Sequence, residues 1–232
     1  MATRQQFAVI GLGRFGSAMA TTLAELGHDV IGMDGDEEKV RHLADSISMA
    51  MQLDATDEKA LRAAGIQDVG CAVVSIGENI ESSLLVVMLL REMGIKMIVA
   101  KAVTPLHGRI LEKLGVSRVI FPEREMAIRV AHSLVTPNVL DYIELSRDFS
   151  IVELPAPAEF VGRTLKQLEL RPRYGLTLIA VKRRGADGKE TTNISPSADE
   201  MIRNGDILAL LGSNDRLSQL DRLHWPGEGG RP

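Results

Sequence analysis

Three glycines near the N-terminus have the spacing of a phosphate-binding turn. Gly11, Gly13 and Gly16 complete the pattern G-x-G-x-x-G, which follows the apolar run 7–10 and precedes a segment with helical spacing. In this context the first glycine permits a tight turn, the second lets a phosphate approach the backbone, and the third lets the helix pack against the strand. The free N–H groups at the start of the helix attract an anion. The pattern therefore predicts a phosphate-bearing ligand at this turn.

A carboxylate follows at the distance where the ribose of a nucleotide is expected. Asp34 ends the apolar run 29–33, which is the second strand that the pattern predicts. An acid at this place accepts hydrogen bonds from both ribose hydroxyls and repels a 2′-phosphate, so we expect an adenine nucleotide. Asp36, two residues later, fits the N-cap of the next helix, and we favour that interpretation.

Polar or small residues also follow the third and fourth expected strands. Asp54, in the run Asp-Ala-Thr, either accepts a hydrogen bond from the adenine amino group or caps the helix that starts near Asp57. Both interpretations stay open. After the fourth strand, Gly77 lets the backbone approach the ribose or the phosphates. In an open parallel sheet the carboxyl ends of the strands are where ligands bind, so we expect these segments to converge on one site.

The composition argues against a nucleic-acid-binding protein and against membrane-spanning segments. The net charge is −4, no block is rich in Lys or Arg, and the aromatic residues are five Phe, two Tyr and one Trp. No apolar run reaches membrane length, and no signal segment begins the chain. Cys71, the only cysteine, lies in an apolar run and is expected to be a buried small hydrophobe. We expect a soluble cytoplasmic protein.

The residues give little support for catalysis. The five histidines lack metal-ligand spacing, and neither G-x-S-x-G nor G-K-[ST] occurs. A dehydrogenase normally needs a second domain that brings a substrate pocket to the nicotinamide, and residues 138–220 are few for that purpose. We therefore expect binding without turnover. The alternative is a small NAD-dependent oxidoreductase.

Strand and helix patterns alternate up to about residue 136, with strands expected over 6–10, 29–33, 48–52, 71–76, 96–100 and 116–121. This repeat predicts an α/β domain, residues 1–137, built on a doubly wound, parallel, Rossmann-like sheet. Pro137 is expected to end it. Residues 138–222 alternate over shorter runs with turn signals, which predicts a small α+β domain with hairpins and one short helix at 164–168. Residues 223–232 have linker composition and are expected to be disordered.

Several of these segments together resemble the RCK family, the regulators of potassium conductance. They are the glycine turn 11–16, Asp-Ala-Thr at 54–56, Ser-Ile-Gly-Glu-Asn at 75–79, Lys-Ala at 101–102 and Phe-Pro-Glu at 121–123. The runs 171–175 and 194–196 resemble the second, RCK-C, domain. The likeness covers nearly the whole chain and is greatest to the cytoplasmic subunits of the Ktr and Trk potassium-uptake systems, the KtrA type in particular.

The resemblance implies a regulatory subunit that is not an enzyme. It implies a homodimer assembled into an octameric ring, held peripherally on the inner face of the cell membrane by an integral-membrane potassium-translocating subunit of the KtrB or TrkH kind. It implies gating by nucleotide, with ATP activating and ADP inactivating, and with NAD or NADH binding in the same cleft.

The resemblance also implies particular contacts. Arg14 would reach the terminal phosphate, often across the dimer, although it also fits a solvated side chain. Glu123 would bind Mg²⁺ or Ca²⁺ between nucleotide phosphates, although an acid at a helix start is favoured by the dipole in any case. The full set of expected nucleotide contacts is Gly11, Gly13, Arg14, Phe15, Gly16, Asp34, Gly35, Asp36, Asp54, Ala55, Thr56, Ile76, Gly77, Glu78, Lys101, His107 and Glu123.

A second ligand site in the C-terminal domain, at a dimer interface, is one of two interpretations of this part of the chain. Five residues match a region that binds cyclic di-AMP in some relatives: Leu168, Leu170, Arg171, Tyr174 and Pro196. Arg171 fits a bidentate phosphate contact, and the apolar residues fit the faces of a purine. The alternative, which we favour, is that the apolar residues are domain core and Arg171 is a surface cation.

Overall fold

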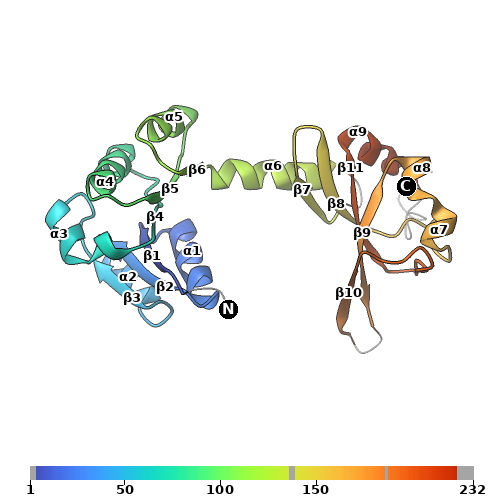
Figure 1. Cartoon of the computed structure of the whole chain (residues 1–232), viewed down its shortest axis with the longest axis horizontal. Helices are drawn as coiled ribbons and strands as arrows, with labels where there is room; N and C mark the ends of the chain where they lie inside the picture. The colour runs from blue at the N-terminus through green and yellow to red at the C-terminus, as the bar shows by residue number, and fades with distance from the viewer. Residues whose placement is uncertain (1–3, 136–138, 186–187, 224–232) are drawn as a thin grey trace, which may run out of the picture. The chain divides into compact units, whose positions relative to one another are not determined.

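The computed structural model describes residues 4–135, 139–185 and 188–223 (Figure 1). The chain divides into two compact units, Met1–Glu123 and Arg124–Pro232. Pro137, where the domain boundary is predicted, lies outside the described residues, and so does the predicted tail apart from Leu223.

The described part of the first unit is built on a six-stranded parallel sheet with the strand order β3-β2-β1-β4-β5-β6. The strands are β1 (Gln6–Ile10), β2 (Asp29–Asp34), β3 (Met49–Gln52), β4 (Cys71–Val74), β5 (Met97–Lys101) and β6 (Arg118–Ile120). The doubly wound parallel fold predicted from the sequence is therefore confirmed. The strand order reverses between β1 and β4, which makes the carboxyl ends of these two strands the switch point of the sheet.

Helices connect these strands, and short polar side chains start several of them. The helices are α1 (Arg14–Glu25), α2 (Glu37–Leu43), α3 (Glu58–Ala63), α4 (Ile80–Glu92), α5 (Pro105–Lys113) and α6 (Pro122–Val135), with a 3₁₀ turn η1 (Ile66–Asp68). The N-caps Asp36, Asp57, Asn79 and Thr104 each accept a hydrogen bond from a backbone N–H in the first turn. Helix α6 begins in the first unit and continues into the second.

Alternate residues of the central strand belong to the two apolar clusters of the first unit. Ala8 and Ile10 pack in one cluster and Val9 packs in the other, and all three are almost fully buried. This is the expected result for a strand that is covered on both sides by helices. Cys71 begins β4 and is buried in the same cluster as Val9. A central strand held from both sides fixes the position of the turn that leaves it at Gly11.

The described part of the second unit contains a five-stranded antiparallel sheet with the order β10-β9-β11-β8-β7. The strands are β7 (Asp141–Glu144), β8 (Phe149–Pro155), β9 (Thr177–Arg184), β10 (Glu190–Ile194) and β11 (Ile207–Ser213). The helices α7 (Leu165–Leu168), α8 (Leu170–Tyr174) and α9 (Asn214–Leu217) and the 3₁₀ turn η2 (Ser218–Arg222) complete it. Its own core includes the fully buried Phe160, Leu168 and Leu176.

The second unit contains more helices than the sequence pattern predicts. The one short helix expected at 164–168 is followed at once by α8, and α9 was not expected. Glu169 separates α7 from α8 with a left-handed φ of 49°. Residue 172, within α8, is a proline. Because proline ordinarily interrupts a helix, the sequence pattern does not predict this one.

A buried ion pair joins β9 to the loop before β11. Asp206 is fully buried, and its two carboxylate oxygens accept hydrogen bonds from Nε and Nη2 of Arg183, each at 2.7 Å. Asp206 also accepts a hydrogen bond from the backbone N–H of Arg203, and Arg183 contacts Glu200 at 3.2 Å. The pair is bidentate and well partnered, so the charge of Asp206 is compensated inside the unit.

Candidate functional site

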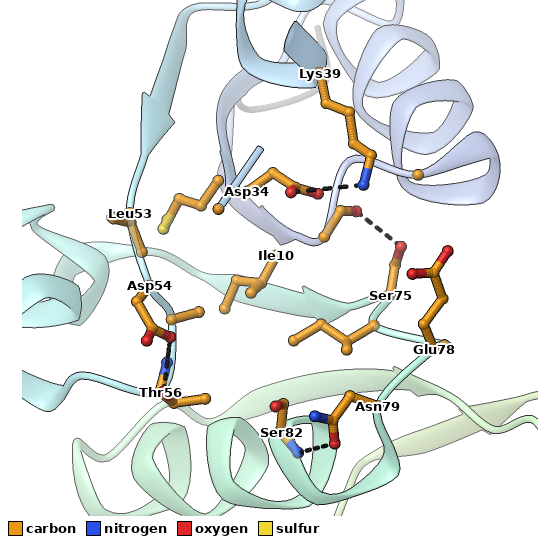
Figure 2. Close-up of a pocket in the computed structure, with 17 residues that line it drawn as sticks. Ile10, Asp34, Lys39, Leu53, Asp54, Thr56, Ser75, Glu78, Asn79 and Ser82 are labelled. Carbon is orange, nitrogen blue, oxygen red and sulfur yellow. Dashed lines mark hydrogen bonds and ion pairs between the residues drawn. The ribbon is translucent and has the colours of Figure 1, made fainter. Parts of the chain in front are cut away.

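A cavity of about 440 Å³ opens at the carboxyl ends of β1, β2 and β4, at the switch point of the sheet (Figure 2). The residues that line it are Ile10, Gly11, Gly13, Met33, Asp34, Gly35, Lys39, Leu53, Asp54, Ala55, Thr56, Ser75, Ile76, Gly77, Glu78, Asn79 and Ser82. A volume of this order suits a small organic ligand, and the position is where open α/β sheets bind nucleotides.

The three glycines of the turn face three different surroundings. Gly11 has a φ of +91°, and a Cβ on it would lie 3.1 Å from the backbone nitrogen of Ile76. A Cβ on Gly16 would lie 1.9 Å from the carbonyl oxygen of Gly11, so α1 can pack here only without a side chain. A Cβ on Gly13 would meet no protein atom within 4 Å. Gly13 is therefore the position that leaves room for a ligand.

Side-chain hydrogen bonds hold the glycine turn against β2 and β4. Oγ of Ser75 donates to the carbonyl oxygen of Gly11 at 2.9 Å. The carboxylate of Asp34 accepts from the backbone N–H of Leu12 at 2.7 Å through Oδ2 and from that of Asp36 at 2.9 Å through Oδ1. The turn is thus fixed by contacts that do not involve a ligand.

Asp34 lies at the cavity, as the sequence predicted, with its side chain only 13% exposed. Each carboxylate oxygen accepts one bond from the backbone and has capacity for one more, which leaves Asp34 able to accept from ribose hydroxyls. Nζ of Lys39 lies 3.8 Å from Oδ1 of Asp34 and 3.7 Å from Oδ2 of Asp36, and Figure 2 shows the Lys39 and Asp34 side chains pointing toward one another. No motif in the sequence predicts Lys39 as a cavity residue.

Asp36 and Asp54 take different local roles. Oδ1 of Asp36 accepts the N–H of Glu38 and so caps α2, which was the favoured interpretation, and Asp36 does not line the cavity. Asp54 lines it, and the cap of α3 is Asp57 instead. Oδ1 of Asp54 accepts both the hydroxyl and the backbone N–H of Thr56, and these bonds hold the pKa of Asp54 below its usual value. Asp54 is therefore an ionised acceptor at the cavity wall.

The structure brings ten of the expected contacts into the cavity lining and leaves seven outside it. Those in the lining are Gly11, Gly13, Asp34, Gly35, Asp54, Ala55, Thr56, Ile76, Gly77 and Glu78. Those outside it are Arg14, Phe15, Gly16, Asp36, Lys101, His107 and Glu123. Sequence reasoning missed the apolar Ile10, Met33 and Leu53, and the polar Lys39, Ser75, Asn79 and Ser82.

Lys101, at the end of β5, forms an ion pair with Glu123, in the first turn of α6. The Lys101 side chain is 13% exposed, whereas that of Glu123 is 68% exposed. The hydrogen bond from Lys101 holds the pKa of the Glu123 carboxyl below its usual value, and the charge of Arg14 adds a smaller contribution in the same direction. Arg14 itself is exposed in the first turn of α1.

His107 is buried in α5, with 1% of its surface exposed. Its Nδ1 accepts the backbone N–H of Val103 at 3.4 Å, which leaves the proton of the neutral ring on Nε2. Nε2 is buried and has no hydrogen-bond partner among the described residues. Burial lowers the pKa of His107, so the ring is neutral at physiological pH.

In the second unit, the residues expected to bind a second ligand are divided between a cavity and the core. Leu170, Arg171 and Pro196 line an open cavity of about 440 Å³. Leu168 is fully buried, and the Tyr174 ring packs edge-on against Phe160 with 5.5 Å between ring centroids. The two non-glycine residues described with left-handed φ are Glu169, which lines this cavity, and Ser195, which precedes Pro196.

No group of three or more His, Cys, Asp or Glu residues in the described part of the chain is arranged to hold a metal ion. None of the helices that these residues form is both long enough and apolar enough to cross a membrane.

Comparison with known proteins identifies both halves of the chain. The TrkA-N domain model matches residues 7–122, and the TrkA-C domain model matches residues 149–224. The chain is 42% identical over 219 residues to the Ktr system potassium uptake protein C of Bacillus subtilis (strain 168), covering 94% of this chain and 97% of that protein. It is 38% identical over 217 residues to protein A of the same system, covering 94% and 96%. Of these two, the identity is higher to protein C than to the KtrA type that the resemblance favoured.

Solved structures agree on the fold. The GsuK RCK domain superimposes with a TM-score of 0.65 at 21% identity, and the GsuK channel bound to NAD with a TM-score of 0.62 at 20% identity. The chain is covered at 100% and 98%, but it spans 49% and 41% of those chains. Together with the sequence matches over both domains, this architecture shows that the chain belongs to the TrkA-N/TrkA-C family of RCK proteins, as a regulatory subunit of the Ktr potassium-uptake type.

Proposed function

We propose that the chain senses adenine nucleotides in the cavity of its first unit and thereby controls the transport of potassium by a membrane partner. The observation that supports this most directly is the arrangement of the glycine turn, where Gly13 has open space beside it and Asp34 lies across the cavity at the end of β2. ATP and ADP are the ligands we propose first, with NAD or NADH as further ligands of the same cavity.

The roles within the cavity follow from the chemistry of its walls. The ribose hydroxyls donate to Asp34, and the phosphates lie at Gly13 beside the free N–H groups of α1. The ionised Asp54 accepts from the adenine amino group, because its Oδ2 is not used in the turn with Thr56. Arg14 is the first residue of α1 and lies outside the lining, and we assign its guanidinium to the terminal phosphate.

The assembly is part of the same proposal. We propose a homodimer within an octameric ring that docks from the cytoplasmic side on an integral-membrane potassium-translocating subunit. Glu123 is the residue proposed to bind Mg²⁺ or Ca²⁺ together with phosphate oxygens, since a carboxylate is a suitable ligand for either ion. Its pairing with Lys101 means that the cation would have to compete for it. The oxidoreductase alternative finds no support in the relatives, which are potassium uptake proteins.

Calorimetric titration of the full chain with ATP, ADP, NAD and NADH, with and without Mg²⁺, tests the proposal. We expect ATP and ADP to bind without being consumed. Arg14→Ala should weaken the binding of ATP more than that of ADP, because only ATP carries a γ-phosphate. Arg41→Ala, on the exposed face of α2, is the matched control. Turnover of NADH, or equal losses of ATP and ADP in Arg14→Ala, would contradict the respective assignment.

A second ligand, cyclic di-AMP, is proposed for the second unit on the strength of its open cavity. Arg171 and the apolar Leu170 and Pro196 lie together there and suit a phosphate and a purine. Leu168 and Tyr174 belong instead to the packed interior, so we propose no direct contact for them. Titration of the full chain should show micromolar binding that Arg171→Ala abolishes. Arg147→Ala is the control, because Arg147 is exposed between β7 and β8 and does not line this cavity. Absence of binding in the folded wild type would remove this second site.

A further inference from the structure

Lys101 has its ammonium group against the wall of the nucleotide cavity. Gly77 lines that cavity, and a Cβ on Gly77 would lie 3.4 Å from Nζ of Lys101 and 3.7 Å from Cε. One residue without a side chain therefore stands between the ammonium and the cavity. The Lys101 side chain is mostly buried, so its charge is poorly exposed to water and needs an anionic partner.

That partner is Glu123, and it differs from Lys101 in exposure. The Glu123 side chain is 68% exposed, so its carboxylate can move into water at little cost, whereas Lys101 cannot. Arg14, in the first turn of the helix that follows the glycine turn, also acts on Glu123 through its charge. Glu123 therefore supplies the negative charge that Lys101 needs, and the charge of Arg14 acts on it more weakly.

We propose that Glu123 is an internal competitor of the nucleotide's phosphates. In the nucleotide-free chain, its carboxylate forms the ion pair with Lys101. A phosphate that reaches Gly77 replaces the carboxylate as the partner of Lys101, and Glu123 is released. This inference rests on the proposed function, because it assumes that polyphosphate enters the cavity at the glycine turn. It assigns Lys101 the role of phosphate contact and Glu123 a role that needs no metal.

The exchange has a consequence for α6. Glu123 lies in the first turn of this helix, which continues from the first unit into the second. When a phosphate replaces Glu123 as the partner of Lys101, the start of α6 loses its ion pair with the end of β5. Ligands with more phosphates compete better for the ammonium, so the exchange distinguishes ATP from adenosine.

The test is calorimetry in a chelator, so that no divalent ion is present. Glu123→Gln should bind ATP about two- to fivefold more tightly than wild type, the range that corresponds to a partly exposed ion pair, and should bind adenosine unchanged. Lys101→Met should weaken ATP by a similar factor. In the double variant, Glu123→Gln should have no further effect, because the cation for which it competes is absent.

Glu58→Gln is the matched control, since Glu58 also starts a helix and pairs with a cation, Arg62, at 2.7 Å. Unchanged or weaker ATP binding by Glu123→Gln in chelator would overturn the competitor role. An equal gain in affinity for ATP and for adenosine would overturn it too, because such a gain would not depend on the phosphates. Lack of any nucleotide binding by the wild type would instead overturn the proposed function itself.

Discussion

Asp34 combines two tasks in one side chain. Its carboxylate accepts the N–H of Leu12 and thereby holds the glycine turn, and the same group faces the cavity where a ribose would lie. We therefore expect binding and local stability to be coupled at this residue, which a pattern of glycines followed by an acid does not reveal.

We expect Asp34→Ala to weaken ATP, ADP and NAD alike, by about 1.5–3 kcal/mol, because the ribose contact common to them is lost. The variant should also be less stable by about 1–3 kcal/mol, because the N–H of Leu12 loses its partner. Calorimetry and urea denaturation measure the two effects. Asp36→Ala, which removes the cap of α2 and a contact with Lys39 but leaves the bond to Leu12 in place, is the comparison. Unchanged nucleotide affinity in Asp34→Ala would refute the ribose contact.

His107 makes the stability of the first unit depend on pH near neutrality. Its pKa in the folded chain is below the ordinary value of 6.5, so between these two values the unfolded chain binds more protons. Stability should therefore be lost as the pH falls below about 6.5, with a slope of at most about 1.4 kcal/mol per pH unit.

Urea denaturation at pH 7.5 and pH 5 measures this loss. His107→Gln should lose less stability than wild type over the interval, whatever its stability at pH 7.5. His42→Gln, which changes an exposed histidine of α2, should behave as wild type. Parallel pH profiles of wild type and His107→Gln would exclude this role.

The residues that the sequence predicts best are those whose signal is local. Gly11, Gly13 and Asp34 lie in one continuous pattern, and all three line the cavity. The Lys101–Glu123 pair could not be predicted, because it depends on the turns after β5 and β6 lying at neighbouring positions of the sheet.

At the scale of the elements, the fit of α1 against the sheet depends on the absence of one side chain. Gly16 is buried in α1, and a Cβ there would overlap the carbonyl oxygen of Gly11 and lie 2.6 Å from Oγ of Ser75. A helical glycine exchanged for alanine ordinarily gains about 1 kcal/mol from helix propensity. Here the overlap involves backbone atoms, which cannot move aside without shifting the turn.

Gly16→Ala should therefore destabilise the chain and weaken every nucleotide, in spite of the better helix propensity. We expect a net loss of about 1–3 kcal/mol, the usual cost of overpacking. Thermal unfolding and ATP titration check this. Ala18→Gly, at an exposed position of the same helix, should cost about 1 kcal/mol and leave ATP affinity unchanged. A Gly16→Ala variant as stable as wild type would show that α1 can shift.

The elements of the first unit were more predictable than those of the second. Buried parallel strands form continuous apolar runs, and the run at 71–74 became β4 with every residue buried. In the second unit α8 has only five residues and includes Pro172, and α9 has four, so neither shows a helical repeat. Their positions are set by packing against the sheet, which the sequence alone does not show.

At the scale of the whole molecule, each unit has its own hydrophobic core. The clusters around β1 and β4 contain only residues of the first unit, and the cluster around Phe160 contains only residues of the second. All residues that line the nucleotide cavity belong to the first unit. Stability of the second unit and affinity of the first are therefore expected to respond to different substitutions.

Asp206→Asn tests this separation. The substitution breaks the bidentate pair with Arg183 inside the second unit, which should cost about 3 kcal/mol of stability. ATP affinity at a temperature where the chain is folded should match that of wild type. Differential scanning calorimetry and ATP titration give the two quantities. A parallel loss of ATP affinity would show that the second unit supports the cavity.

The burial of Cys71 makes the protein suitable for site-specific labelling. It is the only cysteine of the chain, it is 5% exposed in β4, and burial raises the pKa of its thiol. A thiol of this kind holds little thiolate at neutral pH and reacts slowly with maleimides. One cysteine introduced at an exposed position, such as Glu190 on β10, would therefore carry a fluorophore without removal of the native thiol. Spectroscopic measurement of nucleotide-dependent motion can start from the natural sequence.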